Sequence, residues 1–126
     1  MNKQVINTEG APAPIGPYNQ AILTNNTLYI SGQIPINPLT NELVAGDIAA
    51  ETHQSMRNLE AILHAAGMSF NDVVKTTIFL SDMDLFAKVN EVYGSYFAAD
   101  YPARETVAVK GLPKNVNVEI SMIATL

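Results

Sequence analysis

The chain has 126 residues, of which 48% are hydrophobic and 15% charged, and this length and composition predict a single folded domain over residues 1–126. The net charge of −5, with seven scattered Lys and Arg residues, argues against nucleic-acid binding, and the absence of cysteine excludes disulfides, thiolate metal sites and a thiol nucleophile. No segment approaches the roughly 18 apolar residues of a transmembrane helix, so we expect a cytoplasmic protein that does not enter a membrane.

The N-terminal part of the chain leads into a stiff loop. Val5-Ile6 is a possible short edge strand, and residues 10–17 are rich in Pro and Gly. Each proline restricts its own backbone and that of the preceding residue, so the loop has few conformations. It ends at Tyr18, whose hydroxyl is either held in one place by the loop or belongs to an ordinary half-buried surface residue.

Two strands follow, and they are predicted to form a hairpin. Ala21–Thr24 and Leu28–Ile34 are joined by Asn25-Asn26, which tolerate the left-handed turn that a hairpin needs. Ser31 is a candidate hydrogen-bonding residue or a structural hydroxyl, and Gly32 beside it lets a ligand or another backbone approach closely. Alternation predicts that Leu28, Ile30, Gly32 and Ile34 share one face, and that Tyr29, Ser31 and Gln33 share the other.

A loop over 35–46 is predicted to precede a long helix. Asp47 is a suitable N-cap, the apolar stripe continues to about Ala66, and Gly67 stands at the expected stop. Both histidines of the chain, His53 and His64, lie on this helix. They are about 16 Å apart along its axis and therefore cannot share a metal ion. We interpret both as surface or helix-flank residues.

A second strand–helix unit comes next. Val73–Leu80 is the strongest strand signal of the chain. Asp82 or Asp84 is expected to cap a helix over Leu85–Phe97. Asn90 stands at the edge of the apolar stripe of this helix, where its amide either bonds to a loop or reaches a cavity.

The last quarter of the chain carries the candidate catalytic groups. Arg104 follows Pro102 at the start of a β-branched run, and a guanidinium held at a strand entrance is suited to grip a small carboxylic acid. Glu119 is a lone carboxylate in a predicted strand over Asn117–Thr125, whose apolar residues alternate onto the opposite face. The alternative interpretation is an Arg104–Glu119 ion pair that merely joins two strands.

This order of elements predicts an α+β fold in which both helices cover one face of a single sheet. The other face would then be uncovered, and oligomerisation is the obvious way to bury it. The residues expected on the uncovered face by alternation are Tyr29, Ser31, Gln33, Glu119, Ser121 and Ile123.

Several short segments together resemble one family. The matching segments are Ala13-Pro14-Ile15-Gly16-Pro17-Tyr18-Asn19-Gln20-Ala21, Ser31-Gly32-Gln33-Ile34-Pro35, Asp72-Val73-Val74-Lys75-Thr76-Thr77, Phe86-Ala87-Lys88-Val89-Asn90, Pro102-Ala103-Arg104, and Leu112-Pro113 with Val118-Glu119-Ile120. They cover almost the whole chain in the same order and approximate spacing as in the Rid (YjgF-like) family of reactive enamine and imine deaminases, which the chain therefore resembles.

The resemblance implies a chorismate-mutase-like fold and a homotrimer with ligand clefts between subunits. It implies cofactor-free and metal-free hydrolysis of 2-aminoacrylate and related imines to 2-oxo acids and ammonia. On the family pattern, Arg104 would bind the substrate carboxylate and Glu119 would position or activate the attacking water. Tyr18, Ser31, Gly32, Asn90 and the backbone of Thr106 would line the cleft.

Glu105 is the position where the chain departs most from the family pattern, because small hydroxylated residues are common there. Inside the cleft its carboxylate would compete for Arg104, but strand alternation predicts that it points away. A non-catalytic trimer that binds small 2-oxo or amino acids in a regulatory role is the alternative function, and a ribonuclease is disfavoured by the acidic charge.

Overall fold

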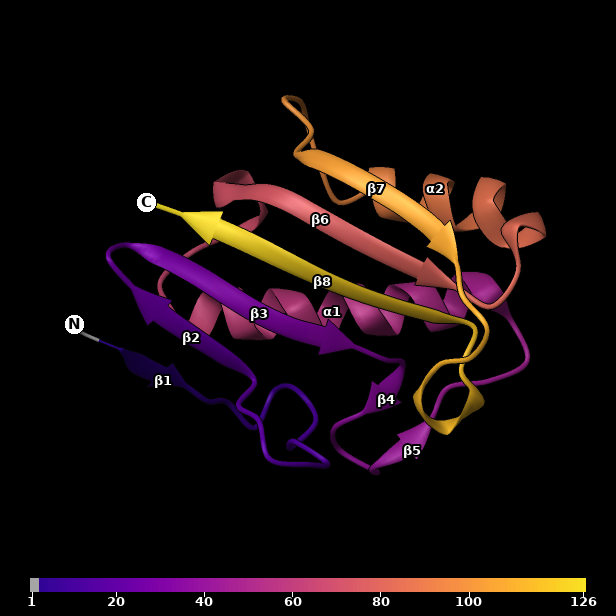
Figure 1. Cartoon of the computed structure of the whole chain (residues 1–126), viewed down its shortest axis with the longest axis horizontal. Coiled ribbons are helices and arrows are strands. Elements are labelled where there is room, and N and C mark those ends of the chain that lie inside the picture. Colours follow the sequence, from indigo (N-terminus) through magenta and orange to yellow (C-terminus); the bar gives the residue numbers. More distant parts are fainter. Residues whose placement is uncertain (1–2) are drawn as a thin grey trace.

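A computed structural model describes residues 3–126, whereas Met1 and Asn2 lie outside the described residues. Six strands form one mixed sheet, in the order β1-β2-β3-β8-β6-β7, in which only β6 and β7 run parallel. Both helices lie behind this sheet, as Figure 1 shows, so one face is covered and the other is not. The strands are β1 (Gln4–Ile6), β2 (Ala21–Thr24), β3 (Thr27–Gln33), β6 (Val73–Leu80), β7 (Ala103–Ala108) and β8 (Val118–Thr125). The expected fold is confirmed.

The long helix forms as its sequence predicts. Helix α1 (Ile48–Ala65) begins after Asp47, whose carboxylate accepts a hydrogen bond of 3.0 Å from the Ala49 N–H. It ends before Gly67, whose positive φ of 75° suits glycine. None of the helices in residues 3–126 is long and apolar enough to cross a membrane.

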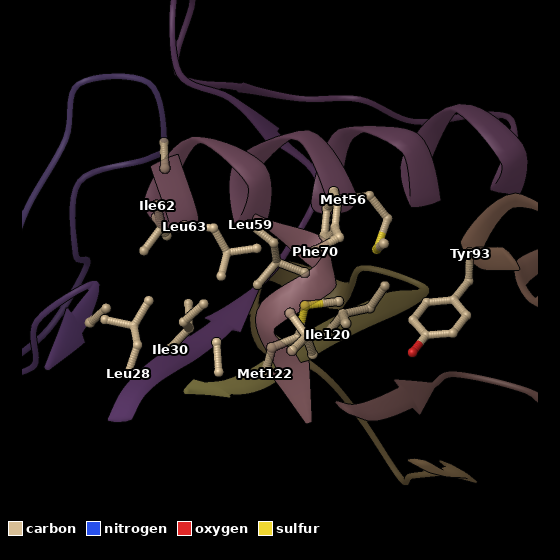
Figure 2. Packing of buried hydrophobic residues seen from close by; sticks show 14 of the residues in the cluster. Leu28, Ile30, Met56, Leu59, Ile62, Leu63, Phe70, Tyr93, Ile120 and Met122 are labelled. Atoms are coloured by element: carbon tan, nitrogen blue, oxygen red, sulfur yellow. The ribbon is translucent and has the colours of Figure 1, made fainter. Parts of the chain in front are cut away.

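The core lies between α1 and the covered face of the sheet, where Figure 2 shows its side chains interlocking. The apolar stripe of α1 is completely buried at Met56, Leu59, Ile62 and Leu63. Every second residue of β8 points toward this stripe and is at most 2% exposed: Val118, Ile120, Met122 and Ala124. The alternation predicted for this strand is therefore confirmed, and it places Glu119 on the uncovered face.

A β-bulge interrupts the alternation of β3. Ile30 pairs with Met122, but Gln33 pairs with Ile120, so Ser31 and Gly32 together occupy the space opposite one residue of β8. The extra residue turns Gln33 onto the covered face, where it is 5% exposed. The prediction that Gln33 lies on the uncovered face is wrong for this reason. The prediction that Gly32 shares the covered face with Leu28 and Ile30 is wrong as well, because a Cβ added to Gly32 would meet Glu119 on the uncovered face.

The second helix is shorter than predicted. Asp82 caps a single 3₁₀ turn (Met83–Leu85), and α2 (Phe86–Gly94) ends three residues before Phe97. Tyr96 and Phe97 donate to carbonyls three residues back, which is the bonding of a tightened turn and not of an α-helix.

The predicted loop over 35–46 contains a small hairpin, β4 (Ile36–Asn37) with β5 (Glu42–Leu43). The amide of Asn58, fully buried on α1, donates to the carbonyls of Ile34 and Ile36 at 3.3 and 3.0 Å. These bonds attach the hairpin to α1.

The uncovered face mixes polar and apolar side chains and carries an ion pair. Lys75 and Glu105 lie 3.1 Å apart on neighbouring strands, and Thr77 donates a 2.7 Å hydrogen bond to the same carboxylate. Around them, Val5, Tyr29 and Val107 are 50%, 49% and 43% exposed. Exposed apolar side chains that gather on one sheet face commonly mark a contact with another protein surface.

Candidate active site

Arg104 lies on the covered face, at the sheet edge formed by β7. It pairs in register with Thr76 on β6, which in turn pairs with Met122 on β8, and both of these side chains are buried under the helices. The Arg104 guanidinium carbon is 5.1 Å from the Tyr93 ring centre and 5.7 Å from that of Phe86. Among residues 3–126 the guanidinium has neither an ion-pair nor a hydrogen-bond partner.

Two further predicted residues lie near Arg104. Asn90 is exposed on α2, and its side chain and Arg104 line one open hollow of about 570 Å³ together with Tyr93, Tyr101 and Pro102. Thr106 follows two residues after Arg104 on the same face of β7, and its buried hydroxyl has no hydrogen-bond partner in the described part of the chain. We call Asn90, Arg104 and Thr106 the arginine half-site.

Glu119 lies on the uncovered face and packs against the bulge of β3. A Cβ atom added to Gly32 would be 2.6 Å from the Glu119 Oε2, so only glycine leaves room for this carboxylate. Within residues 3–126, no hydrogen bond or salt bridge engages the Glu119 side chain. Burial raises the pKa of this carboxyl above its ordinary value, since nothing compensates the loss of water around the charge.

Tyr18 and Ser31 complete this second group. The Tyr18 hydroxyl accepts a 3.3 Å hydrogen bond from the Ile15 N–H, and the side chain is 46% exposed. The Ser31 hydroxyl donates to the Asn19 carbonyl at 2.6 Å. Tyr18 and Gly32 line one small hollow of about 20 Å³. We call Tyr18, Ser31, Gly32 and Glu119 the glutamate half-site.

Gln20, which the sequence analysis did not single out, fixes the loop before Tyr18. Its side-chain oxygen accepts from the Thr8 N–H at 2.8 Å, and its amide donates to the carbonyls of Thr8, Ala11 and Pro12 at 3.0, 3.2 and 2.9 Å. The sequence feature that could have indicated this role is the loop composition. A proline-rich loop has carbonyls but few N–H groups of its own, so it needs donors from a nearby side chain.

The two half-sites lie on opposite faces of the sheet, and β6 separates β8 from β7. Arg104 and Glu119 therefore form no ion pair within the chain, and the interpretation as a strand-joining pair is wrong. Glu105 points away from Arg104, as predicted, because it lies on the uncovered face with Lys75. One chain cannot bring both charged groups to a single ligand.

The donor set of a metal site is not assembled in the described range. Residues 3–126 contain no group of three or more His, Cys, Asp or Glu side chains placed to hold a metal ion. His53 instead contacts the Tyr96 hydroxyl at 2.7 Å and is only partly exposed on the flank of α1. His64 is exposed near the end of that helix.

Comparisons with known proteins agree on one family. A family model described as endoribonuclease L-PSP matches residues 8–126. A RutC family protein of Pyrococcus horikoshii is 57% identical, over 97% of both chains. The human protein named 2-iminobutanoate/2-iminopropanoate deaminase is 47% identical, over 97% of this chain and 89% of its own. The crystal structure of a conserved Rid-family protein of unknown function from Yersinia pestis superimposes with a TM-score of 0.97, at 48% identity over 99% of this chain and 100% of that one.

Proposed function

The chain belongs to the Rid (YjgF/RidA) family, and from this premise we propose that it is a 2-iminobutanoate/2-iminopropanoate deaminase. The proposed reaction is the hydrolysis of small enamines and imines of 2-oxo acids to the 2-oxo acid and ammonia. The observation that carries the proposal is a pair of charged groups, the Arg104 guanidinium and the Glu119 carboxylate, that have no hydrogen-bond or ion-pair partner within residues 3–126.

Arg104 is suited to anchor the carboxylate of such a substrate. Its guanidinium offers a planar fork of donors that matches a carboxylate, and no acidic side chain within residues 3–126 occupies it. Asn90 lines the same hollow and supplies an amide for a second polar contact. Thr106 lies in the edge strand β7, where half of the backbone groups face away from the sheet and are free to bind the ligand.

Glu119 is suited to activate the attacking water. Its raised pKa makes the carboxylate a stronger proton acceptor than an ordinary glutamate. In the proposed step, water adds to the C=N carbon, one water proton goes to Glu119, and Glu119 passes this proton to the nitrogen, which gives a neutral carbinolamine. The hydroxyl proton of the carbinolamine then moves to its amino group as the C=O bond forms, and the C–N bond breaks to release ammonia. The imine is already electrophilic, so orientation of the water and one acceptor suffice.

The site requires a second copy of the chain, because the two half-sites lie on opposite faces of the sheet. We propose a homotrimer in which the arginine half-site of one subunit meets the glutamate half-site of its neighbour. The exposed apolar side chains of the uncovered face, among them Tyr29 and Val107, would be buried by the same assembly. Light scattering should give about three times the chain mass of 13.6 kDa.

A nuclease activity has little support in the charges of this chain, although the family model is described as an endoribonuclease. The net charge is −5, and an RNA backbone is bound chiefly by clustered Lys and Arg. In the structure, two of the few basic side chains, Lys75 and Lys88, are already paired with glutamates.

The proposed function is tested by coupling the protein to a threonine or serine dehydratase, whose products are the proposed imines. Addition of the protein should accelerate the release of ammonia and 2-oxo acid beyond the spontaneous rate. An Arg104→Lys variant should lose roughly ten- to a hundredfold, since a point charge replaces the two-pronged fork. Unchanged release with the wild-type protein, combined with measurable binding of a 2-oxo acid, would favour the regulatory binder instead.

A further inference from the structure

The groups that surround the Arg104 guanidinium are unusual for a partly buried charge. Buried arginines are normally paired with a carboxylate, which compensates the loss of water. Within residues 3–126 the Arg104 guanidinium has no such partner, and it lies instead over the rings of Tyr93 and Phe86 at 5.1 and 5.7 Å. Both distances fall within the range of a cation–π interaction.

The Tyr93 ring is itself rigidly held. Its hydroxyl donates a 2.9 Å hydrogen bond to the hydroxyl of Thr76, the residue that pairs with Arg104 in register on the neighbouring strand. Tyr93 is 3% exposed, and Figure 2 shows it at one end of the core with its hydroxyl toward the sheet. Burial raises the pKa of Tyr93, so this hydroxyl remains a neutral donor, although the nearby Arg104 charge acts in the opposite direction.

Phe86 approaches the guanidinium from the first turn of α2 and is 37% exposed. Its exposure means that core packing alone does not account for an aromatic residue here. Phe86 and Tyr93 thus both contact Arg104 from α2.

Aromatic rings and a carboxylate hold an arginine with different consequences. A carboxylate would occupy the N–H donors and neutralise the charge, which would weaken binding of an anionic ligand. A ring contacts the flat face of the guanidinium and leaves the N–H donors at its rim free. Rings therefore fix the plane of the fork without competing for it.

We infer that Phe86 and Tyr93 are positioning residues, which orient the Arg104 fork for the carboxylate of the ligand. The inference rests on the proposed function only in taking Arg104 as the carboxylate anchor. Phe86 is the residue that can be varied, because Tyr93 belongs to the core and its replacement would also disturb folding.

The test compares Phe86→Leu, which removes the ring, with Phe86→Tyr, which keeps it. The measurements are the Kd for 2-oxobutanoate and for its uncharged amide by calorimetry, the KM and kcat for imine hydrolysis, and the melting temperature. Phe86→Leu should weaken binding of the acid and raise KM about three- to tenfold, whereas Phe86→Tyr should restore most of the affinity. Binding of the amide should change less than binding of the acid.

Two controls identify Arg104 as the group through which Phe86 acts. In an Arg104→Lys background, Phe86→Leu should add little further loss, because the planar fork that the ring orients is gone. Met83→Ala removes a 45% exposed apolar side chain just before α2 and should leave Kd and KM unchanged.

The outcomes separate this inference from the proposed function. A wild-type affinity for 2-oxobutanoate in Phe86→Leu would overturn the inference, as would an equal loss for acid and amide or a full additional loss in the Arg104→Lys background. A wild-type protein that binds 2-oxobutanoate but releases no ammonia from imines would overturn the proposed function alone. A wild-type protein that binds no 2-oxo acid would overturn both.

Discussion

Glu119, the proposed proton acceptor, illustrates at the scale of one residue how burial changes a carboxyl group. A carboxylate that is partly buried without a partner is less stable in its charged form, and its pKa rises. For a structural residue this would be a defect. For a general base it brings the pKa closer to the pH at which the residue works.

Replacement of Glu119 by glutamine should therefore slow imine hydrolysis by about 10²–10⁴-fold while the trimer and its affinity for 2-oxo acids are kept. The amide preserves the shape of the side chain but accepts protons poorly. In the wild type, kcat/KM should fall on acidification at a higher pH than an ordinary glutamate would give. A variant with full rate would assign Glu119 a structural role and leave the water to Ser31 and the backbone.

The same substitution, Glu119→Gln, should lower the activity but raise the free energy of unfolding at neutral pH. A carboxyl whose pKa is raised by folding contributes stability below the pKa of the unfolded chain, and this contribution is lost as pH rises through the folded value. At about pH 7, well above the ordinary glutamate pKa of roughly 4.3, the buried charge of Glu119 therefore lowers the free energy of unfolding. A neutral glutamine at this position has no such effect. Glu119→Gln should melt above the wild type at neutral pH, and calorimetry should find the difference shrinking toward about pH 4. A wild type that is the more stable protein at neutral pH contradicts this assignment.

Gly32 determines where the Glu119 carboxylate lies. In Gly32→Ala, the new Cβ would meet the end of the Glu119 side chain at 2.6 Å, and the flexible carboxylate would move aside more easily than the backbone. We expect a nearly unchanged melting temperature and an activity loss of about a hundredfold, since a displacement near 1 Å can have that effect. Gly111→Ala, where an added Cβ contacts nothing within 4 Å, is the matched control. Equal activity of the two variants would show that the position of Glu119 tolerates this shift.

At the scale of elements, hydrophobic periodicity was sufficient to predict the strands of the main sheet and the presence of the two helices that cover it. It placed Val118, Ile120 and Met122 in the core because β8 is regular. It failed for Gln33, because a bulge depends on the partner strand and leaves no mark in the alternation of its own strand. The end of α2 was also missed, since Phe97 packs against Phe70 and Tyr93 and thus looks like a continuation of the apolar stripe.

The loop over residues 8–17 is held by one buried side chain, that of Gln20, which directly precedes strand β2. Gln20→Met keeps the size of that side chain but leaves the backbone groups of Thr8, Ala11 and Pro12 without their partner. We expect a loss of about 2–4 kcal/mol in the free energy of unfolding and faster proteolysis within the loop. Gln4→Met, on the exposed surface of β1, is the control and should have little effect. Equal denaturation midpoints for both variants would mean that the hydrogen bonds of Gln20 do not stabilise the loop.

At the scale of the whole molecule, the decisive feature is the separation of the two half-sites by the sheet. Alternation alone predicted the face of Glu119. The face of Arg104 could not be predicted, because it depends on the register of β7 with β6, which is set by contacts distant in sequence. For the same reason alternation could not tell whether one chain brings the predicted site residues together, and only the family resemblance implied clefts between subunits.

Subunit mixing tests the central claim, that each active site combines Arg104 of one subunit with Glu119 of another. Arg104→Ala and Glu119→Gln proteins, each checked for trimer mass and each nearly inactive, are unfolded together in equal amounts and refolded. In random mixed trimers about a quarter of the subunit contacts join an intact Arg104 to an intact Glu119, so about a quarter of the wild-type activity should return. Activity that stays at the level of the two parent variants would show that no site is shared between subunits and would contradict the account.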